Sequence, residues 1–584
     1  MKYIKEYAFS ALAILMASCS SDSDTIEPEA QTPPVTSSGT MSFSASIESG
    51  ETASKATRTS LADANTDSPY PIWSSGDQIK VLNTTTEDAQ LFTINSSDVG
   101  KRAANFTGEI KVETGNNANN KFYAFYAGNV GASEGAPTIS MSGSNVTVSG
   151  TIPSTQSSTP AFNPNLHFMT ACTTGSAFSF KNGMSLLKVT ISENNYENFG
   201  ICRIRFKANN PDENIAGTFT ATIADDGTLG DYTVTNGSNE IVIGDGTTAL
   251  ATGTYYIAIF PCAFSQGFTL AFEDANDNNL KVYDRIKETS FDVGKSEIIN
   301  LGSYTAKECA KYAYVDLGIT YSNKKVIWGI QNIYDEAGEA ISGTNRTTTE
   351  TSPNSSYYAW GETYVKSNQY KETATNNYSW YYTYGIGTGT DEGTVNKRSY
   401  KYGVGNGRLN DAWDSSNRWI FDTSTSGVLS KYNRYDGYKG SITDWSGGNQ
   451  DNKQYLDAED DVAYQKTSGL MRIPNYSQWN ALIGQVGKTI SVTKDESANV
   501  YKIENTTTHR YITLPIGGYR HKTSANDNQE LKDADVCTYW ARNLSSGYSN
   551  TCYQARCYII SEGSITQIND ARCQGRMVRG VIYR

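Results

Sequence analysis

The chain has 584 residues, a formal net charge of −12 and only three histidines. Its length exceeds what one ordinary hydrophobic core organises, so we expect about two to four domains. The acidic balance argues against a nucleic-acid partner, which needs a basic face, and three histidines in unrelated contexts argue against a histidine-based metal or catalytic centre.

The N-terminus has the features of an export signal. Lys2 and Lys5 precede a short apolar run at residues 8–16, and two small residues then lead to Cys19. The run is shorter than the roughly 20 apolar residues of a membrane-spanning helix, so it predicts a secretory signal over residues 1–18. The order of these parts resembles the lipobox of bacterial lipoproteins, and the resemblance implies that Cys19 carries lipid and anchors the chain in the outer membrane. The alternative is a plain signal followed by a chance cysteine.

Residues 19–40 are rich in Ser, Thr, Pro, Asp and Glu and contain no basic residue. Such a segment cannot bury a core, so we expect a flexible tether. Its acidic start, directly after Cys19, resembles the tag that sends some lipoproteins to the outer face of the outer membrane. We therefore expect a surface-exposed protein.

Strand signals fill residues 41–304. Apolar and polar residues alternate in segments such as Met41–Ile47, and Asp226-Gly and Asn236-Gly mark tight turns. Few helical periods occur in this region. The pattern predicts a mainly β fold with two β-sandwiches, at residues 41–195 and 196–304.

Five short motifs over this region resemble the fimbrillin family. They are Arg58-Thr-Ser-Leu, Ile72-Trp-Ser-Ser-Gly-Asp-Gln-Ile-Lys-Val, Ala124-Phe-Tyr-Ala, Phe180-Lys-Asn-Gly-Met-Ser-Leu-Leu-Lys-Val and Ile215-Ala-Gly-Thr-Phe. The resemblance implies two transthyretin-like sandwiches in a lipoprotein precursor of cell-surface pili. It also implies that other pilin subunits join by strand addition, after an Arg- or Lys-specific protease has removed the first strand.

Two basic residues are candidates for that cleavage. Lys55 and Arg58 lie in a Ser/Thr/Ala-rich segment after the first expected strand. Such a segment is typical of an exposed, cleavable loop. The alternative, which we favour, is that both are ordinary loop residues.

After a short polar linker at residues 305–313, the composition becomes aromatic and rich in Gly and Asn. Apolar residues at Trp479, Leu482 and Ile483 predict a helix after Pro474. Motifs across residues 314–584 resemble the Fibrobacter succinogenes major paralogous domain, which implies an α+β, C-type-lectin-like fold with long loops. The motifs are Val315-Asp-Leu-Gly, Ala359-Trp-Gly-Glu-Thr, Glu459-Asp-Asp-Val-Ala, Arg472-Ile-Pro, Leu514-Pro, Gly518-Tyr-Arg, Tyr539-Trp and Val578-Arg-Gly-Val.

Aromatic residues of this domain could form a platform for a sugar or a protein, because aromatic faces suit the apolar faces of sugar rings. Trp360, Tyr519 and Trp540 lie in the domain motifs, so we expect them in the core. Trp413 and Trp445 lie in the variable loops and are the candidate ligand contacts.

An acidic group, Asp457, Glu459, Asp460 and Asp461, could ligate calcium through its oxygen atoms. Acidic residues at the start of a helix also interact favourably with its dipole. We favour the structural interpretation and expect no metal and no cofactor.

Nine cysteines occur, and eight remain if Cys19 carries lipid. An even number in an exported chain favours disulfides, and four of them, Cys537, Cys552, Cys557 and Cys573, lie close to the end. The sequence leaves their pairing open.

No enzyme motif occurs in a suitable context. We expect a surface lipoprotein that serves as a fimbrial tip subunit or adhesin and binds a glycan or a protein through its C-terminal domain. One alternative is a glycan-binding lipoprotein for nutrient capture, without a pilus. Another is an enzyme on the lectin-like fold that uses a cysteine pair.

Overall fold

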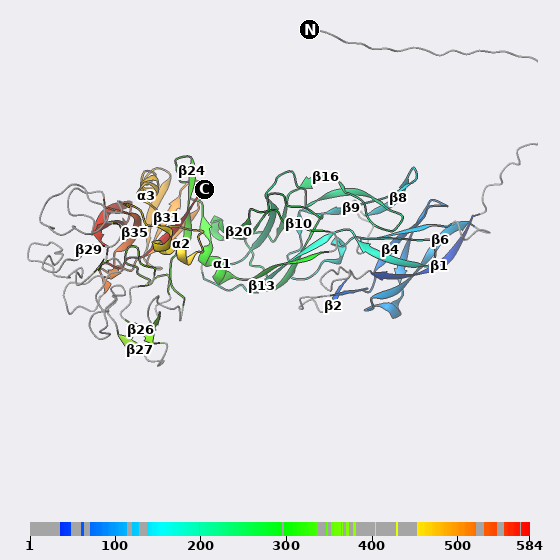
Figure 1. Cartoon of the computed structure of the whole chain (residues 1–584), viewed down its shortest axis with the longest axis horizontal. Helices are drawn as coiled ribbons and strands as arrows, with labels where there is room; N and C mark the ends of the chain where they lie inside the picture. Colours follow the sequence, from blue (N-terminus) through cyan, green and yellow to red (C-terminus); the bar gives the residue numbers. More distant parts are fainter. Residues whose placement is uncertain are drawn as a thin grey trace, which may run out of the picture.

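The computed structural model describes the chain in segments separated by gaps. The described residues are 36–47, 60–62, 70–113, 120–127, 137–197, 199–294, 297–336, 346–348, 352–354, 356–363, 365, 369–372, 378–380, 403–404, 428–429, 432, 453–520, 531–545, 554–572 and 574–584. The fold is mainly β, as predicted. The described parts form an elongated body, with β1 (Thr36–Ile47) near one end and the C-terminal domain at the other (Figure 1). Within these residues, no helix is long and apolar enough to span a membrane.

The first of the two expected sandwiches closes into a barrel. Its strand order is β1-β12-β11-β7-β4-β5-β6, and β1 pairs with β6 on one side and β12 on the other. Residues 36–40, expected in the tether, are part of β1, where their exposed side chains give no alternating signal. The other barrel strands are β4 (Gln78–Asn83), β5 (Asp88–Ile94), β6 (Ala103–Glu113), β7 (Phe122–Tyr126), β11 (Met169–Thr173) and β12 (Ala177–Asn182), and β2 (Ser60–Ala62) pairs with β3 (Tyr70–Ile72) beside them.

Aromatic side chains fill the barrel. Phe43 on β1 contacts Phe92 and Phe122 with ring centroids 5.3 and 5.0 Å apart, and Trp73 contacts Phe106 at 4.9 Å. All of these rings are buried, and alternate residues of β1 point inward, as the sequence pattern predicts.

The second sandwich does not begin at residue 195. Strands β8–β10 and β13 precede that position, yet β9 pairs with β15, β10 with β17, and β13 with both β18 and β21. Apolar alternation identifies strands but not their partners, which explains the difference. The strands are β8 (Thr138–Ser142), β9 (Asn145–Ile152), β10 (Thr155–Gln156), β13 (Ser185–Glu193), β14 (Arg203–Ala208), β15 (Ala216–Ile223), β16 (Thr233–Ser238), β17 (Glu240–Ile243), β18 (Gly253–Ile259), β19 (Phe268–Asp274), β20 (Lys281–Lys287) and β21 (Ile298–Thr305).

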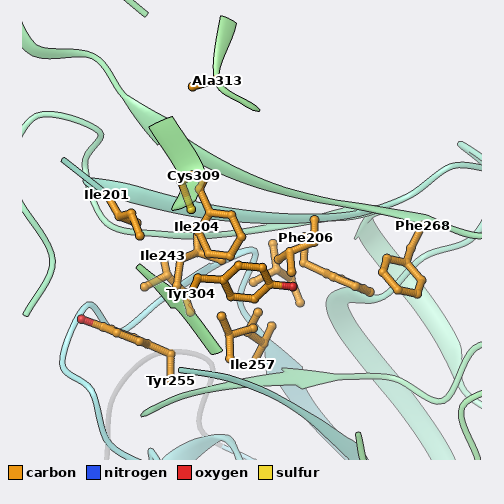
Figure 2. Close-up of a cluster of buried hydrophobic side chains, with 14 of the residues drawn as sticks. Ile201, Ile204, Phe206, Ile243, Tyr255, Ile257, Phe268, Tyr304, Cys309 and Ala313 are labelled. Carbon is orange, nitrogen blue, oxygen red and sulfur yellow. The ribbon is translucent and has the colours of Figure 1, made fainter. Parts of the chain in front are cut away.

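The expected polar linker at residues 305–313 is largely a helix, α1 (Ala306–Tyr312). Thr305 and Glu308 form a reciprocal capping box in which each side chain accepts a hydrogen bond from the other residue's backbone N–H. One face of α1 is buried. Its Cys309 lies in the same apolar cluster as Tyr304 of β21 and as Ile204 and Phe206 of β14 (Figure 2).

One sheet continues from the second sandwich into the C-terminal domain. Strand β22 (Tyr314–Val315) pairs with β20 through Val282–Tyr314 and with β24 (Lys324–Asn332), and β24 also pairs with β38 (Arg579–Tyr583). The two regions therefore share backbone hydrogen bonds as well as side-chain contacts.

The C-terminal domain packs two three-stranded sheets and short helices around this sheet. Trp479 lies between Trp328 and Tyr558, with ring centroids 4.9 and 4.6 Å away. Its main elements are β30 (Ile490–Asp495), β31 (Val500–Asn505), β32 (Tyr511–Pro515), β35 (Cys537–Leu544), β36 (Gln554–Ser561), β37 (Ser564–Ala571), α2 (Val462–Lys466) and α3 (Tyr476–Ile483). Shorter strands are β23 (Thr320–Tyr321), β25 (Arg346–Thr348), β26 (Gln369–Glu372), β27 (Tyr378–Trp380), β28 (Gly403–Val404), β29 (Val428–Leu429), β33 (Tyr519–Arg520) and β34 (Leu531–Lys532).

Candidate functional site

Several candidate residues lie outside the described part of the chain. These are Cys19, Lys55, Arg58, Trp413 and Trp445. Their predicted roles in lipid attachment, cleavage and ligand contact therefore stay predictions.

Two of the three aromatic residues in the domain motifs lie in the core, as expected. Trp360 and Trp540 are each 1% exposed. Their indole N–H groups donate to the carbonyls of Ala541 at 2.8 Å and Tyr358 at 2.7 Å. Tyr519 is only half-buried, and its ring faces the Arg576 guanidinium at 4.5 Å. Trp360 and Trp540 are thus structural.

The acidic group divides into a cluster and a separate helix cap. Asp457, Glu459 and Asp460 bring carboxylate oxygens within 4.8 Å of one another. Lys453 donates to Asp457 at 2.6 Å, and the Tyr432 hydroxyl donates to Asp460 at 2.5 Å. Protein groups therefore contact the carboxylates of Asp457 and Asp460, which fits the structural interpretation.

Asp461 is the N-cap of α2 and is fully buried. Its carboxylate accepts hydrogen bonds from the backbone N–H groups of Tyr464 at 3.2 Å and Ile473 at 3.1 Å. Burial raises the pKa of Asp461 to about 6, while these two hydrogen bonds and the nearby Arg542 act in the opposite direction. The residue joins α2 to the following segment.

The structure corrects the expectation of disulfides for six cysteines. Cys172, Cys202, Cys262, Cys309, Cys537 and Cys557 are free thiols, and the remaining three lie outside the described residues. Burial raises the pKa of Cys202 to about 11 and that of Cys557 to about 12. Cys202 and Cys557 are buried and behave as small core residues, and so high a pKa leaves little reactive thiolate.

A pocket that the sequence did not indicate lies at the junction of the second sandwich and the C-terminal domain. We call this hollow of about 620 Å³ the junction pocket. Strands β20 and β21 form one wall, α1 another, and residues just after β24 a third. Its lining residues are Tyr283, Ser303, Tyr304, Thr305, Lys307, Glu308, Lys311, Tyr312, Tyr334 and Glu336.

Tyrosines form the apolar part of the junction pocket. The rings of Tyr283 and Tyr312 lie 5.6 Å apart at 30°. Tyr304 is held by three contacts. Its ring centroid is 4.4 Å from that of Phe272. Its hydroxyl accepts a hydrogen bond from Arg285 at 2.6 Å and donates one to the Leu301 carbonyl at 2.8 Å. Burial raises the pKa of Tyr283 and Tyr304, so both hydroxyls stay protonated at neutral pH.

Charged groups form the rest of the lining. Lys311 bridges two regions, because its ammonium is 3.1 Å from Glu336 and 5.9 Å from the ring centroid of Tyr334. One Glu308 oxygen is used by the capping box of α1. Among the described residues, the exposed Lys307 ammonium contacts no hydrogen-bond or ion-pair partner.

No protein-family model and no curated protein sequence matches the chain. Similar solved structures include a provisionally assigned cell adhesion protein of Bacteroides ovatus, at 12% identity and a TM-score of 0.28, which covers 46% of this chain and 92% of that protein. A provisionally assigned cell adhesion protein of Bacteroides uniformis shares 15% identity at a TM-score of 0.23, with coverages of 43% and 98%. A C-terminally truncated tip fimbrial protein of Porphyromonas gingivalis shares 9% identity at a TM-score of 0.20, with coverages of 43% and 81%. Values this low do not establish a shared family.

Proposed function

We propose that the chain is a cell-surface lipoprotein that acts as a fimbrial tip subunit or adhesin. It binds a glycan or a protein through its C-terminal domain. The observation that carries this proposal is the elongated arrangement of the described residues, in which β1 and the C-terminal domain lie toward opposite ends (Figure 1). In the uncleaved precursor, a lipid on Cys19 would hold the β1 end near the outer membrane and present the C-terminal domain outward.

The pairing of β1 suits assembly by strand addition. Residues 36–46 of β1 pair with β6, and residues 44–47 pair with β12. If a protease cuts at Lys55 or Arg58, release of β1 opens the barrel and leaves the edges of β6 and β12 unpaired. Such edges accept a strand from another pilin subunit through main-chain hydrogen bonds.

A tip position fits the C-terminal domain better than a position in the shaft. Strand β38 is committed to β24 of its own domain, where Val326, Ile327 and Trp328 are paired with it. Donating β38 to a neighbour would break this pairing. We therefore propose that the subunit accepts a strand and ends the filament.

The test begins with protein extracted from the cell surface. We expect it to co-purify with polymerised pilins, and an N-terminal sequence that begins after Lys55 or Arg58 would support processing at that residue. A monomer that starts only at Cys19 would contradict processing and polymerisation, and would favour the role in nutrient capture. Globomycin blocks removal of lipoprotein signal peptides, so treated cells should accumulate the larger uncleaved precursor. A product of unchanged size would contradict the lipid anchor.

Ligand binding through the loops is tested by full-length variants. Trp413→Ala and Trp445→Ala should reduce adhesion of cells that carry the protein, because they remove large contact surfaces. The matched controls, Trp413→Phe and Trp445→Phe, keep an aromatic ring and should retain more adhesion. Unchanged adhesion in both alanine variants would exclude these two residues as ligand contacts.

A further inference from the structure

We propose that the junction pocket binds a neutral saccharide. This inference rests on the proposed function only in giving the chain a glycan ligand; it adds the junction pocket as a binding site, in addition to the candidate contacts Trp413 and Trp445. The pocket volume of about 620 Å³ falls within the range of roughly 300–1,000 Å³ that is usual for small-ligand sites.

The first argument is the combination of aromatic faces and hydroxyl groups. The paired rings of Tyr283 and Tyr312 offer an apolar surface on which the C–H face of a sugar ring can lie. Among the described residues, neither hydroxyl has a hydrogen-bond partner. Both can therefore donate to or accept from sugar hydroxyls at the same surface.

The second argument is the balance of charge. The lining contains two lysines and two glutamates, so their formal charges cancel. Lys311 and Glu336 pair with each other, which leaves Lys307 as a donor and the second Glu308 oxygen as an acceptor. A site that offers donors and acceptors without net charge suits a neutral sugar better than a phosphate, a nucleotide or an acidic sugar.

The third argument is that the walls are fixed before any ligand arrives. The Tyr304 hydroxyl is held by Arg285 and Leu301, α1 by its capping box, and Lys311 by Glu336 across the junction. Binding to such a site loses little side-chain entropy. Because the three walls come from β20 and β21, from α1 and from the segment after β24, the pocket exists only while the second sandwich and the C-terminal domain stay docked.

The experiment uses the full exported chain on a printed array that carries neutral glycans, acidic glycans and proline-rich peptides. We expect the wild-type protein to bind at least one neutral glycan. Tyr312→Ala and Lys307→Ala should each weaken that binding about tenfold or more, as measured by calorimetry with the identified glycan. Tyr312→Phe should retain part of the affinity because it keeps the ring.

Matched controls come from the β23–β24 hairpin of the C-terminal domain. Tyr321→Ala and Lys324→Ala alter an exposed tyrosine and an exposed lysine that do not line the pocket, and should leave binding unchanged. Lys307 is exposed and Tyr312 half-buried, so their variants should fold, which circular dichroism checks.

Three outcomes would overturn the inference: no neutral glycan binds, only acidic glycans or peptides bind, or a neutral glycan binds equally well to the pocket variants. The last outcome, combined with loss in the Trp413→Ala and Trp445→Ala variants, would leave the proposed adhesin function intact and reject only the junction pocket.

Discussion

The barrel and the C-terminal domain are attached to the second sandwich in different ways. The barrel sheet is closed, so it has no free edge, and it contacts the second sandwich through side chains such as Lys121 and Tyr123, which both bind Asp225. The second sandwich has a continuing edge at β20, which β22 joins. A closed sheet can therefore bind a neighbouring domain only through side chains, whereas an open edge lets a second domain extend the same sheet through backbone hydrogen bonds.

We expect the largest loss of folding stability from a substitution in α1. Cys309→Asp places a carboxylate in the apolar cluster of the second sandwich, where Cys309 is 0% exposed, and should destabilise this region by on the order of 3 kcal/mol or more. Calorimetry should show that the second sandwich and the C-terminal domain unfold together at a lower temperature, with the barrel transition unchanged. Lys307→Asp, on the exposed face of α1, is the control and should have little effect. Separate shifts for the two regions would contradict their coupling.

A smaller effect is expected at Asn279. Its buried amide donates to the Tyr511 carbonyl at 3.0 Å and accepts from the Tyr511 N–H at 2.8 Å, so it connects the second sandwich to β32. Asn279→Ala leaves both backbone groups without this partner and should cost about 2 kcal/mol in denaturant unfolding. The exposed Asn145→Ala, in the same sandwich, provides the control. Equal stability of the two variants would show that this contact contributes nothing to the coupling.

The stability of the barrel should fall at acidic pH because of one carboxylate, Asp98. Asp98 accepts hydrogen bonds from Lys101 and from the backbone and side chain of Asn105, and these contacts lower the pKa of Asp98 to about 2. Because the unfolded value is higher, at about 4, the stabilisation is complete above that pH and is lost as the pH falls toward 2. The melting temperature of Asp98→Asn should lie below wild type at neutral pH and approach it near pH 2. A difference that does not depend on pH would refute this role.

The smallest effect is expected at the contact between the barrel and the second sandwich. Asp225 is 86% exposed and binds Lys121 at 2.6 Å and the Tyr123 hydroxyl at 2.7 Å. Exposed ion pairs contribute little and are screened by salt. Asp225→Ala should therefore lower the barrel melting temperature slightly at low salt and not at high salt, whereas Asp212→Ala should not change it. A large loss at any salt concentration would mean that this contact dominates the attachment.

Local patterns in the sequence identified much of the secondary structure. The alternation in Met41–Ile47 predicted a strand with Phe43, Ala45 and Ile47 inside, and all three are buried. The helix expected after Pro474 is α3, with Trp479 and Leu482 buried. These predictions succeed because the period of apolar residues reports directly which face of an element meets the core.

What the sequence did not reveal depends on pairing between distant segments. The insertion of β8–β10 into the second sandwich is a choice of partners, and alternation is the same for every partner. The helix at residues 306–312 had a local signal, the Thr305 to Glu308 capping spacing, which its polar composition obscured. The junction pocket had none, because Tyr283, Tyr312 and Tyr334 meet only when three elements fold together.

The shared sheet at β20, β22 and β24 also has a mechanical consequence. A flexible peptide between two domains lets one swivel freely, so a pulling force first straightens the connection. Here α1 is packed against the core and β22 is bonded on both sides, so tension along the long axis loads the strands from the start. Under such a pulling force, the C-terminal domain keeps its orientation until strand pairs separate.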